Sequence, residues 1–104
     1  SDTACLAQAN ASCIACCQTN HATGIDNLIA YLQACECGTS GACASACSTE
    51  FCVNGSITSA GDACDTCLGT STTAGGACYA SIETQCVDDA SCNAYLSCAD
   101  SCPP

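Results

Sequence analysis

The sequence contains no lysine and no arginine, whereas ten of its 104 residues are aspartate or glutamate. These carboxylates have no cationic side-chain partner except His21 and the amino terminus, so salt bridges cannot hold the fold together. We expect them to be solvated, hydrogen-bonded or placed at helix N-termini. The formal net charge of −10 also disfavours nucleic acid and anionic membrane surfaces as partners, because both repel a negatively charged protein.

Large apolar side chains are scarce as well, since leucine, isoleucine, valine, phenylalanine and tyrosine together supply only sixteen residues. A small domain buries a low fraction of its surface, so a core of this size is marginal by itself. No apolar run approaches the roughly 18 residues of a membrane-spanning helix. Methionine is absent and the chain begins at Ser1, so we expect a mature product from which a signal or pro-segment was removed.

Cysteine, by contrast, is abundant, with sixteen residues. An even number at this density is typical of a disulfide scaffold made in an oxidising compartment. Each bridge can add roughly 2–4 kcal/mol of stability, which would compensate for the small core. We therefore predict a secreted, extracellular protein without a cofactor. The predicted disulfide cysteines are Cys5, Cys13, Cys16, Cys17, Cys35, Cys37, Cys43, Cys47, Cys52, Cys64, Cys67, Cys78, Cys86, Cys92, Cys98 and Cys102.

Twelve of these cysteines form a repeated spacing pattern. One set of six has the spacing C-x2-C-x18-C-x5-C-x5-C-x3-C and consists of Cys64, Cys67, Cys86, Cys92, Cys98 and Cys102. The other has the spacing C-x2-C-x18-C-x1-C-x5-C-x3-C and consists of Cys13, Cys16, Cys35, Cys37, Cys43 and Cys47. A shift of 51 residues also aligns Gly24 with Gly75. The pattern predicts a tandem duplication, with a first module at residues 1–53, a linker at 54–60 and a second module at 61–104.

Apolar and cysteine residues recur at helical intervals in each module. Ser59-Ala60-Gly61-Asp62 resembles a capping box that opens a helix. Asp88 or Asp89 is a suitable N-cap residue for the last helix. We therefore predict an all-α, disulfide-rich fold without a sheet, in which each of two tandem modules has three short helices. In the first module the expected helices span about 4–18, 26–35 and 42–51. In the second module the first expected helix ends near residue 68, and the other two span about 77–87 and 90–101.

The spacing restricts the disulfide pairing without determining it. Cys35 and Cys37 are too close to pair without strain, and if both modules share one connectivity, a Cys86–Cys92 bridge is disfavoured too. Cys43 and Cys47 lie one helical turn apart and should pair elsewhere, so each bridge is expected to join two different helices. The cysteines outside the repeat would form two further bridges, at least one of which could join the modules. These are Cys5, Cys17, Cys52 and Cys78.

Metal and haem chemistry are both disfavoured by the surrounding sequence. Cys13-x2-Cys16-Cys17 and Cys35-x-Cys37 resemble local thiolate clusters. Metallothionein-like chains, however, are rich in lysine and lack helical apolar stripes. The CxxC at Cys13 is followed by Cys17 rather than by the histidine that haem attachment needs, and the CxxC at Cys64 belongs to the repeated cystine pattern. We predict no metal site and no redox site.

No catalytic constellation is apparent. His21, the sole histidine, lies in a polar turn and is predicted to be a loop residue. Nucleophilic catalysis needs a base beside an activated nucleophile, and helix capping accounts for the adjacent acids Asp88 and Asp89. We therefore predict that the protein is not an enzyme.

Two sequons for N-glycosylation are present, at Asn10-Ala11-Ser12 and Asn54-Gly55-Ser56. The first lies in a predicted helix. The second lies in the predicted linker, where an exposed turn would make Asn54 the better acceptor.

The second module resembles the water-borne mating pheromones of Euplotes-type ciliates, which are small, secreted, acidic three-helix proteins. The resemblance rests on Asp62-Ala63-Cys64-Asp65-Thr66-Cys67, on Cys92-Asn93-Ala94-Tyr95-Leu96-Ser97-Cys98, and on the Cys102-Pro103-Pro104 ending. It extends to the first module only through the duplication. The disulfide pairing that it implies for the second module is Cys64–Cys92, Cys67–Cys102 and Cys86–Cys98.

The resemblance implies a diffusible mating signal that binds a receptor protein on the membrane of target cells and could self-associate through helix faces. No nucleic-acid partner and no direct membrane insertion are expected. The sequence does not assign the receptor-contact residues. The alternative is a structural subunit of an extracellular coat or filament, because a chain rich in alanine, serine, threonine and cysteine would suit close packing.

Overall fold

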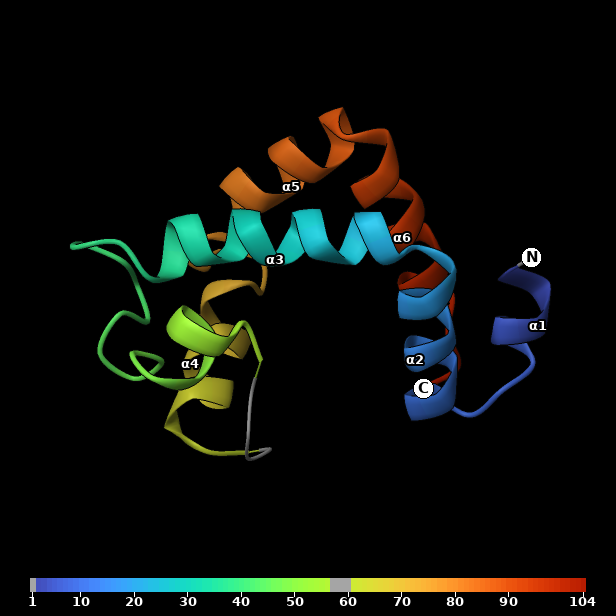
Figure 1. Cartoon of the computed structure of the whole chain (residues 1–104), viewed down its shortest axis with the longest axis horizontal. Coiled ribbons are helices and arrows are strands. Elements are labelled where there is room, and N and C mark those ends of the chain that lie inside the picture. The colour runs from blue at the N-terminus through green and yellow to red at the C-terminus, as the bar shows by residue number, and fades with distance from the viewer. Residues whose placement is uncertain (1, 57–60) are drawn as a thin grey trace. The chain divides into compact units, whose positions relative to one another are not determined.

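The computed structural model of the chain describes residues 2–56 and 61–104, and these are organised in helices, turns and loops without a strand (Figure 1). The prediction of a small, all-α, disulfide-rich fold is confirmed. The described helices are α1 (Asp2–Leu6), α2 (Asn10–Asn20), α3 (Ala22–Glu36), the short π-helix η1 (Glu50–Asn54), α4 (Ala63–Ser71), α5 (Tyr79–Asp88) and α6 (Ala90–Asp100). None of them is long and apolar enough to cross a membrane.

The continuous first helix that we predicted is wrong, because the chain breaks between α1 and α2. The Cys5–Cys16 bridge joins these two helices with a Cα–Cα distance of 5.4 Å. In one straight α-helix, residues eleven apart would lie about 16 Å from each other. The bridge therefore requires the chain to fold back on itself after Leu6.

The predicted third helix is also largely absent, because residues 42–49 form successive turns and only η1 is helical. Cys43 and Cys47 are tied to α4 through Cys67 and Cys64. Small residues fill most of this segment, so its conformation depends on the bridges rather than on an apolar stripe. Residues 54–56 of the predicted linker are described, and residues 57–60 lie outside the described part of the chain.

All sixteen cysteines are paired in eight disulfides, which confirms a disulfide-bonded protein. The pairs are Cys5–Cys16, Cys13–Cys102, Cys17–Cys98, Cys35–Cys78, Cys37–Cys52, Cys43–Cys67, Cys47–Cys64 and Cys86–Cys92.

Three expectations about the pairing are wrong. None of the three pairs implied by the pheromone resemblance occurs, and each cysteine outside the repeat pairs with a cysteine inside it. Cys86 and Cys92 do pair, with a Cα–Cα distance of 5.0 Å. They flank the tight turn between α5 and α6, and their five intervening residues remove the strain that excludes a Cys35–Cys37 bridge.

The chain divides into two compact units that do not follow the predicted modules. Unit 1 comprises Ser1–Leu28 and Cys86–Pro104, and unit 2 comprises Ile29–Gln85. Each unit contains four of the eight bridges, and no disulfide joins one unit to the other. Unit 1 therefore unites the two ends of the chain, whereas the predicted modules were consecutive segments.

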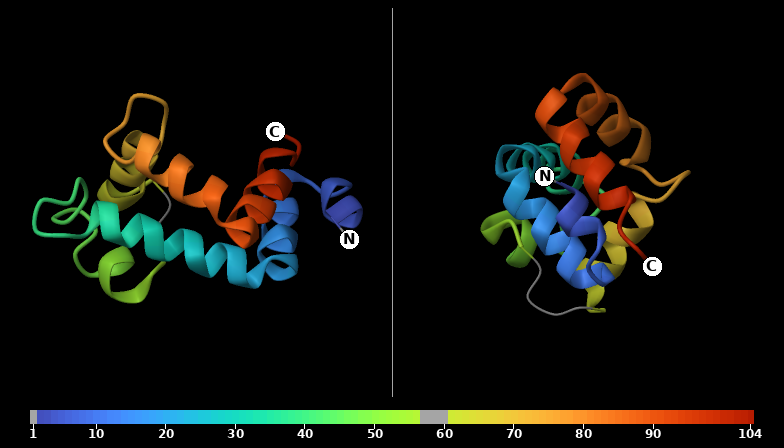
Figure 2. Two further views of the ribbon diagram at one scale, coloured as in Figure 1. Left: turned by 90° about the horizontal axis from the view of Figure 1, so that it is seen from above. Right: turned by 90° about the vertical axis from the view of Figure 1, so that its right-hand side faces the viewer.

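In unit 1, α2 packs against both α1 and α6 (Figure 2). Asp89 caps α6, because its carboxylate accepts hydrogen bonds from the N–H groups of Ser91 and Cys92 at 3.0 and 3.1 Å. The amide of Asn27 donates to the other oxygen of Asp89 at 2.9 Å. The prediction that Asp88 or Asp89 caps this helix therefore resolves to Asp89, which also links α3 to α6.

Gly24 of α3 allows a close helix contact inside unit 1. A Cβ atom added there would lie 2.2 Å from the backbone oxygen of Ser91, which is far inside van der Waals contact. We expect Gly24→Ala to lower the free energy of unfolding by about 1–3 kcal/mol through this overlap, despite the better helix propensity of alanine. Chemical denaturation would measure the change. Gly69→Ala in α4 is the control, since its Cβ would meet open space, and an equal loss in both variants would contradict the contact.

In unit 2, the core is built from sulfur and a few large side chains. Phe51 is 5% exposed and lies among the Cys43–Cys67 and Cys47–Cys64 bridges. Ile29, Leu32 and Leu68 pack against this cluster. The helix beside it, α4, begins at Ala63 and is capped by Asp62, whose carboxylate accepts from the Asp65 N–H at 2.9 Å. The predicted capping box starts at Ser59, which lies outside the described residues. Disulfides and Phe51 thus replace the larger aliphatic core that the composition does not supply.

Candidate functional site

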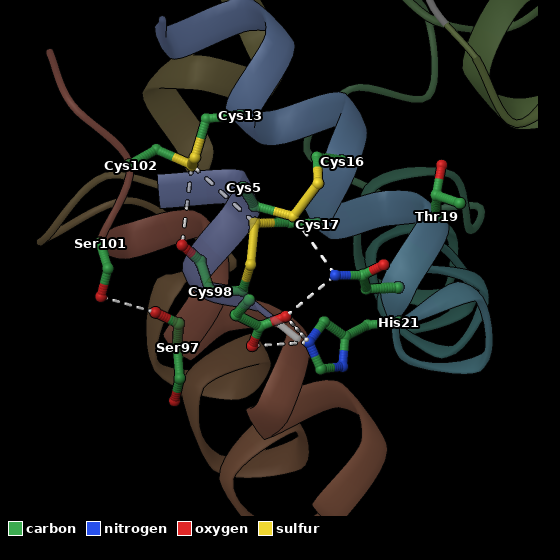
Figure 3. Close-up of a disulfide and its surroundings, with 12 residues drawn as sticks. Cys5, Cys13, Cys16, Cys17, Thr19, His21, Ser97, Cys98, Ser101 and Cys102 are labelled. Carbon is green, nitrogen blue, oxygen red and sulfur yellow. Dashed lines mark hydrogen bonds and ion pairs between the residues drawn. A yellow bond between two sulfur atoms is a disulfide. The ribbon is translucent and has the colours of Figure 1, made fainter. Parts of the chain in front are cut away.

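Three disulfides lie together in unit 1 and hold the ends of the chain (Figure 3). Cys13 and Cys17 lie one turn apart on α2. Their respective partners are Cys102, which follows the end of α6, and Cys98, which lies within α6. This crossed pairing requires the two helices to run antiparallel. The Sγ atoms of Cys17 and Cys102 approach to 3.9 Å, so the two bridges are in van der Waals contact.

His21, the only histidine, lies between α2 and α3 and pairs with Asp2 of α1. Its Nε2 atom is 2.9 and 3.0 Å from the two carboxylate oxygens of Asp2. The amide of Asn20 also donates to Asp2, at 3.3 Å. His21 therefore has a structural partner. It is also the one side chain that the sequence offered as a cationic partner for a carboxylate.

This contact changes the titration of Asp2. The hydrogen bond from His21, helped by that from Asn20, lowers the pKa of the Asp2 carboxyl below its ordinary value of 3.8. The side chain is 38% exposed, so solvent screening limits the effect. A lowered pKa in the folded state means that the contribution to stability is complete above pH 3.8 and is lost as the pH falls through the folded-state pKa.

We expect Asp2→Asn to flatten the fall of the thermal unfolding temperature below about pH 4, because the variant has no carboxylate left to protonate there. Asp88→Asn, in which an exposed carboxylate is removed from α5, serves as the control. Unfolding curves collected between about pH 2 and pH 6 would measure both. If Asp2→Asn kept the full acid dependence of the parent protein, the Asp2–His21 contact would not contribute to stability.

A cleft of about 480 Å³ opens beside His21 on unit 1. Its walls are the turn between α2 and α3 and the first turns of α6. The lining residues are Thr19, Asn20, His21, Ala22, Thr23, Gly24, Ala90, Ser91 and Ala94. Four of these nine residues carry a hydroxyl or amide side chain, so the cleft can exchange hydrogen bonds with a partner.

Unit 2 contains a buried acid that the sequence did not reveal. Glu36 is 0% exposed. One of its carboxylate oxygens accepts a short hydrogen bond from the Ser71 hydroxyl. The other lies 3.0 Å from Sγ of Cys78, which carries no hydrogen because it is bonded to Cys35. Glu36 stands between two cysteines in the sequence, and nothing in its local pattern distinguishes it from the exposed acids.

A second hollow of about 340 Å³ lies on unit 2. It is lined by Ala42, Thr66, Cys67, Thr70, Ser71, Gly76 and Ala77. Methyl groups and sulfur make up much of this lining, so the hollow offers few polar groups for orienting a ligand. The unit 1 cleft has more of them.

Several groups of cysteine, histidine and acid lie close enough together for a metal ion, but their chemistry does not suit one. In each group of the described residues, the cysteines already belong to disulfides. Metal coordination requires free thiolates. In the group of Asp2, His21 and Cys98, the bridged Cys98 leaves only two ligands.

Both sequons lie on described parts of the surface. Asn10 is the first residue of α2, and its amide donates to the backbone oxygen of Pro103 at 2.8 Å. Asn54 is the last residue of η1 and is exposed.

Comparison of the chain with protein-family models, with curated proteins and with solved structures found no match.

Proposed function

We propose that the protein is a secreted signal of the mating-pheromone kind, which acts by binding a receptor protein on the surface of target cells. The observation that carries the proposal is the distribution of disulfides, with four bridges in each compact unit. Cross-links of this density preserve a small fold when the protein is diluted into an oxidising medium. They also allow the exposed side chains to be substituted without loss of the fold.

The pheromone resemblance contributes the receptor part of the proposal, and it rests on sequence features alone. The disulfides observed at Cys64, Cys67 and Cys86 differ from those that the resemblance implied. A descent from the pheromone pattern would therefore require the cystine connectivity to have been rearranged. The acidic surface and the helical, cystine-rich construction remain the features in common.

The unit 1 cleft beside His21 is the surface that we assign to the receptor. It combines hydroxyl and amide groups with the only basic side chain of the chain. The residues that line the cleft belong to segments held by the Cys17–Cys98 and Cys86–Cys92 bridges. The cleft is therefore pre-organised, and binding costs little ordering entropy.

The direct test adds purified, fully oxidised protein to cells of the species that makes it, separately for each mating type. The expected result is pairing in at least one type at low concentration. Protein that has been reduced and alkylated should be inactive, because the cystine-held surface is lost. If no mating type responds at any concentration, the protein is not a mating signal.

Two matched variants test the cleft. Ala90 lines the cleft at the first residue of α6, and Ala80 occupies the first turn of α5. Glutamate at either position suits a helix N-terminus, so both variants should fold. We expect A90E to reduce pairing activity at least tenfold and A80E to leave it unchanged. Equal activity of A90E and the parent protein would exclude the cleft as the contact.

Light scattering distinguishes the structural alternative. A signal should remain small as its concentration rises, whereas a coat or filament subunit should form growing assemblies. Scattering that increases steeply with concentration, together with inactivity in the pairing assay, would favour the extracellular structural role.

A further inference from the structure

The second sequon, Asn54-Gly55-Ser56, lies in unit 2 at the C-terminal end of η1. Both Asn54 and Ser56 are exposed. Gly55 has φ +71°, a left-handed conformation that glycine adopts readily. The chain therefore changes direction between the acceptor asparagine and the serine of the sequon.

This change of direction matters because a sequon acts through both side chains, the asparagine amide as acceptor and the serine hydroxyl beside it. Within an α-helix, residues two apart point to different sides and do not face each other. Asn10 and Ser12 are in that situation, since both lie in α2. At Gly55 the helix has ended, so the side chains of Asn54 and Ser56 are free to approach on one side of the turn.

The contacts of Asn54 are compatible with a sugar on its amide nitrogen. Nδ2 donates one hydrogen bond, to the backbone oxygen of Thr49 at 3.2 Å. An amide nitrogen carries two hydrogens, and glycosylation replaces one, so this bond can persist. The turn itself is held by the Gly55 N–H, which donates to the Phe51 oxygen at 2.9 Å. A glycan would therefore leave the local fold in place.

The neighbour of Asn54 supplies a second reason. Val53 is 73% exposed, the largest exposure among the large hydrophobic side chains of the described residues. An isolated apolar side chain on a surface is ordinary. A sugar on the adjacent residue would nevertheless cover part of it and keep it from contacts between protein copies.

We propose that Asn54 is an N-glycosylation site and that Asn10 is not. The inference rests on the secretory route of the proposed function. The donor would be an oligosaccharide linked through pyrophosphate to a lipid. A bond forms between Nδ2 of Asn54 and C1 of the first sugar, and the bond from C1 to the pyrophosphate oxygen breaks. The lipid pyrophosphate leaves with the electron pair, and the amide nitrogen loses one proton.

The test expresses the chain behind a cleavable signal sequence in a eukaryotic secretory host and measures the intact mass of both secreted and cell-retained protein. The expected result is a mass excess that peptide-N-glycosidase removes. Enzymatic release in heavy-oxygen water should place the label at residue 54, which distinguishes it from spontaneous deamidation of Asn54-Gly55 in an untreated control. S56A should abolish the mass excess while Asn54 is still present, and S12A should retain it.

Each contrary result is informative. An unmodified mass in both protein fractions, or a glycan at Asn10, would overturn the proposal. Thiol titration of S56A should give no free thiol, which shows that its loss of glycan is not a loss of folding. Unmodified protein that still induces pairing would refute only the glycan, whereas glycosylated protein that is inert on every mating type would refute only the signalling function.

Discussion

Replacing Cys17 and Cys98 together by alanine is expected to lower the free energy of unfolding by about 3 kcal/mol. Although this bridge spans a sequence separation of 81, the neighbouring Cys13–Cys102 bridge keeps the same helix ends together in the unfolded chain. With that bridge intact, the ring closed by Cys17–Cys98 contains only about ten residues, which limits the entropy lost. Alanine is preferred to serine because a hydroxyl left at these buried positions would add a cost of its own.

Removing Cys13–Cys102 as well should cost more than the first removal did. The next cross-link that restrains the two segments is Cys35–Cys78, and the ring through it contains about 40 residues, so the second removal should cost about 4 kcal/mol. The four-cysteine variant should therefore lose about 7 kcal/mol, a coupling of about 1 kcal/mol beyond additivity. Denaturant unfolding of the parent, both double variants and the fourfold variant would measure it.

The same variants test the pairing itself. If Cys17 pairs with Cys98, the double variant should contain no free thiol when it is unfolded and titrated. Two free thiols would show that each cysteine has a different partner. Strictly additive losses would show that the two bridges do not restrain one another in the unfolded state.

Replacing Glu36 by alanine is expected to cost about 3 kcal/mol. The variant loses the packing of a fully buried side chain and leaves the Ser71 hydroxyl without the carboxylate to which it donates. Glu36→Gln should cost about half as much, because the amide oxygen can still accept from Ser71 and the volume is kept.

Glu83→Ala is the control for Glu36, since Glu83 is an exposed acid of α5. It should change the free energy of unfolding by no more than about 0.5 kcal/mol. Thermal and denaturant unfolding of the three variants would give the comparison. If Glu36→Ala were as mild as Glu83→Ala, the acid would not be buried as the structure places it.

Helical periodicity predicted the class of the fold and several elements closely. The stripe from Ile25 to Cys35 lies within α3, and the predicted helix at 90–101 differs from α6 by one residue at its end. Such elements depend on local hydrogen bonds and caps, as at Asp62 and Asp89, and local sequence carries that information. The prediction of a helix over residues 42–49 was wrong because the bridges of this segment, rather than its own residues, determine its conformation.

Two glycines at equivalent positions of the repeat have different structural roles. Gly24 and Gly75 align after a shift of 51 residues. Gly24 is needed for the close approach to Ser91, whereas Gly75 has φ +87° and open space around its Cβ position. One position therefore requires glycine for its size and the other for its backbone conformation, and the spacing alone could not distinguish these reasons.

The sequence by itself determined that this is a helical, acidic protein held by disulfides, because composition and periodicity are local properties. Only the tertiary structure decided which sulfurs bond, that both chain ends belong to unit 1, and that Glu36 is buried beside Ser71. These features depend on which residues distant in the chain come within a few ångströms of each other. Cysteine spacing excludes some pairs by strain, as for Cys35 and Cys37, but it leaves many others open, and the packing of α2 against α6 selects among them.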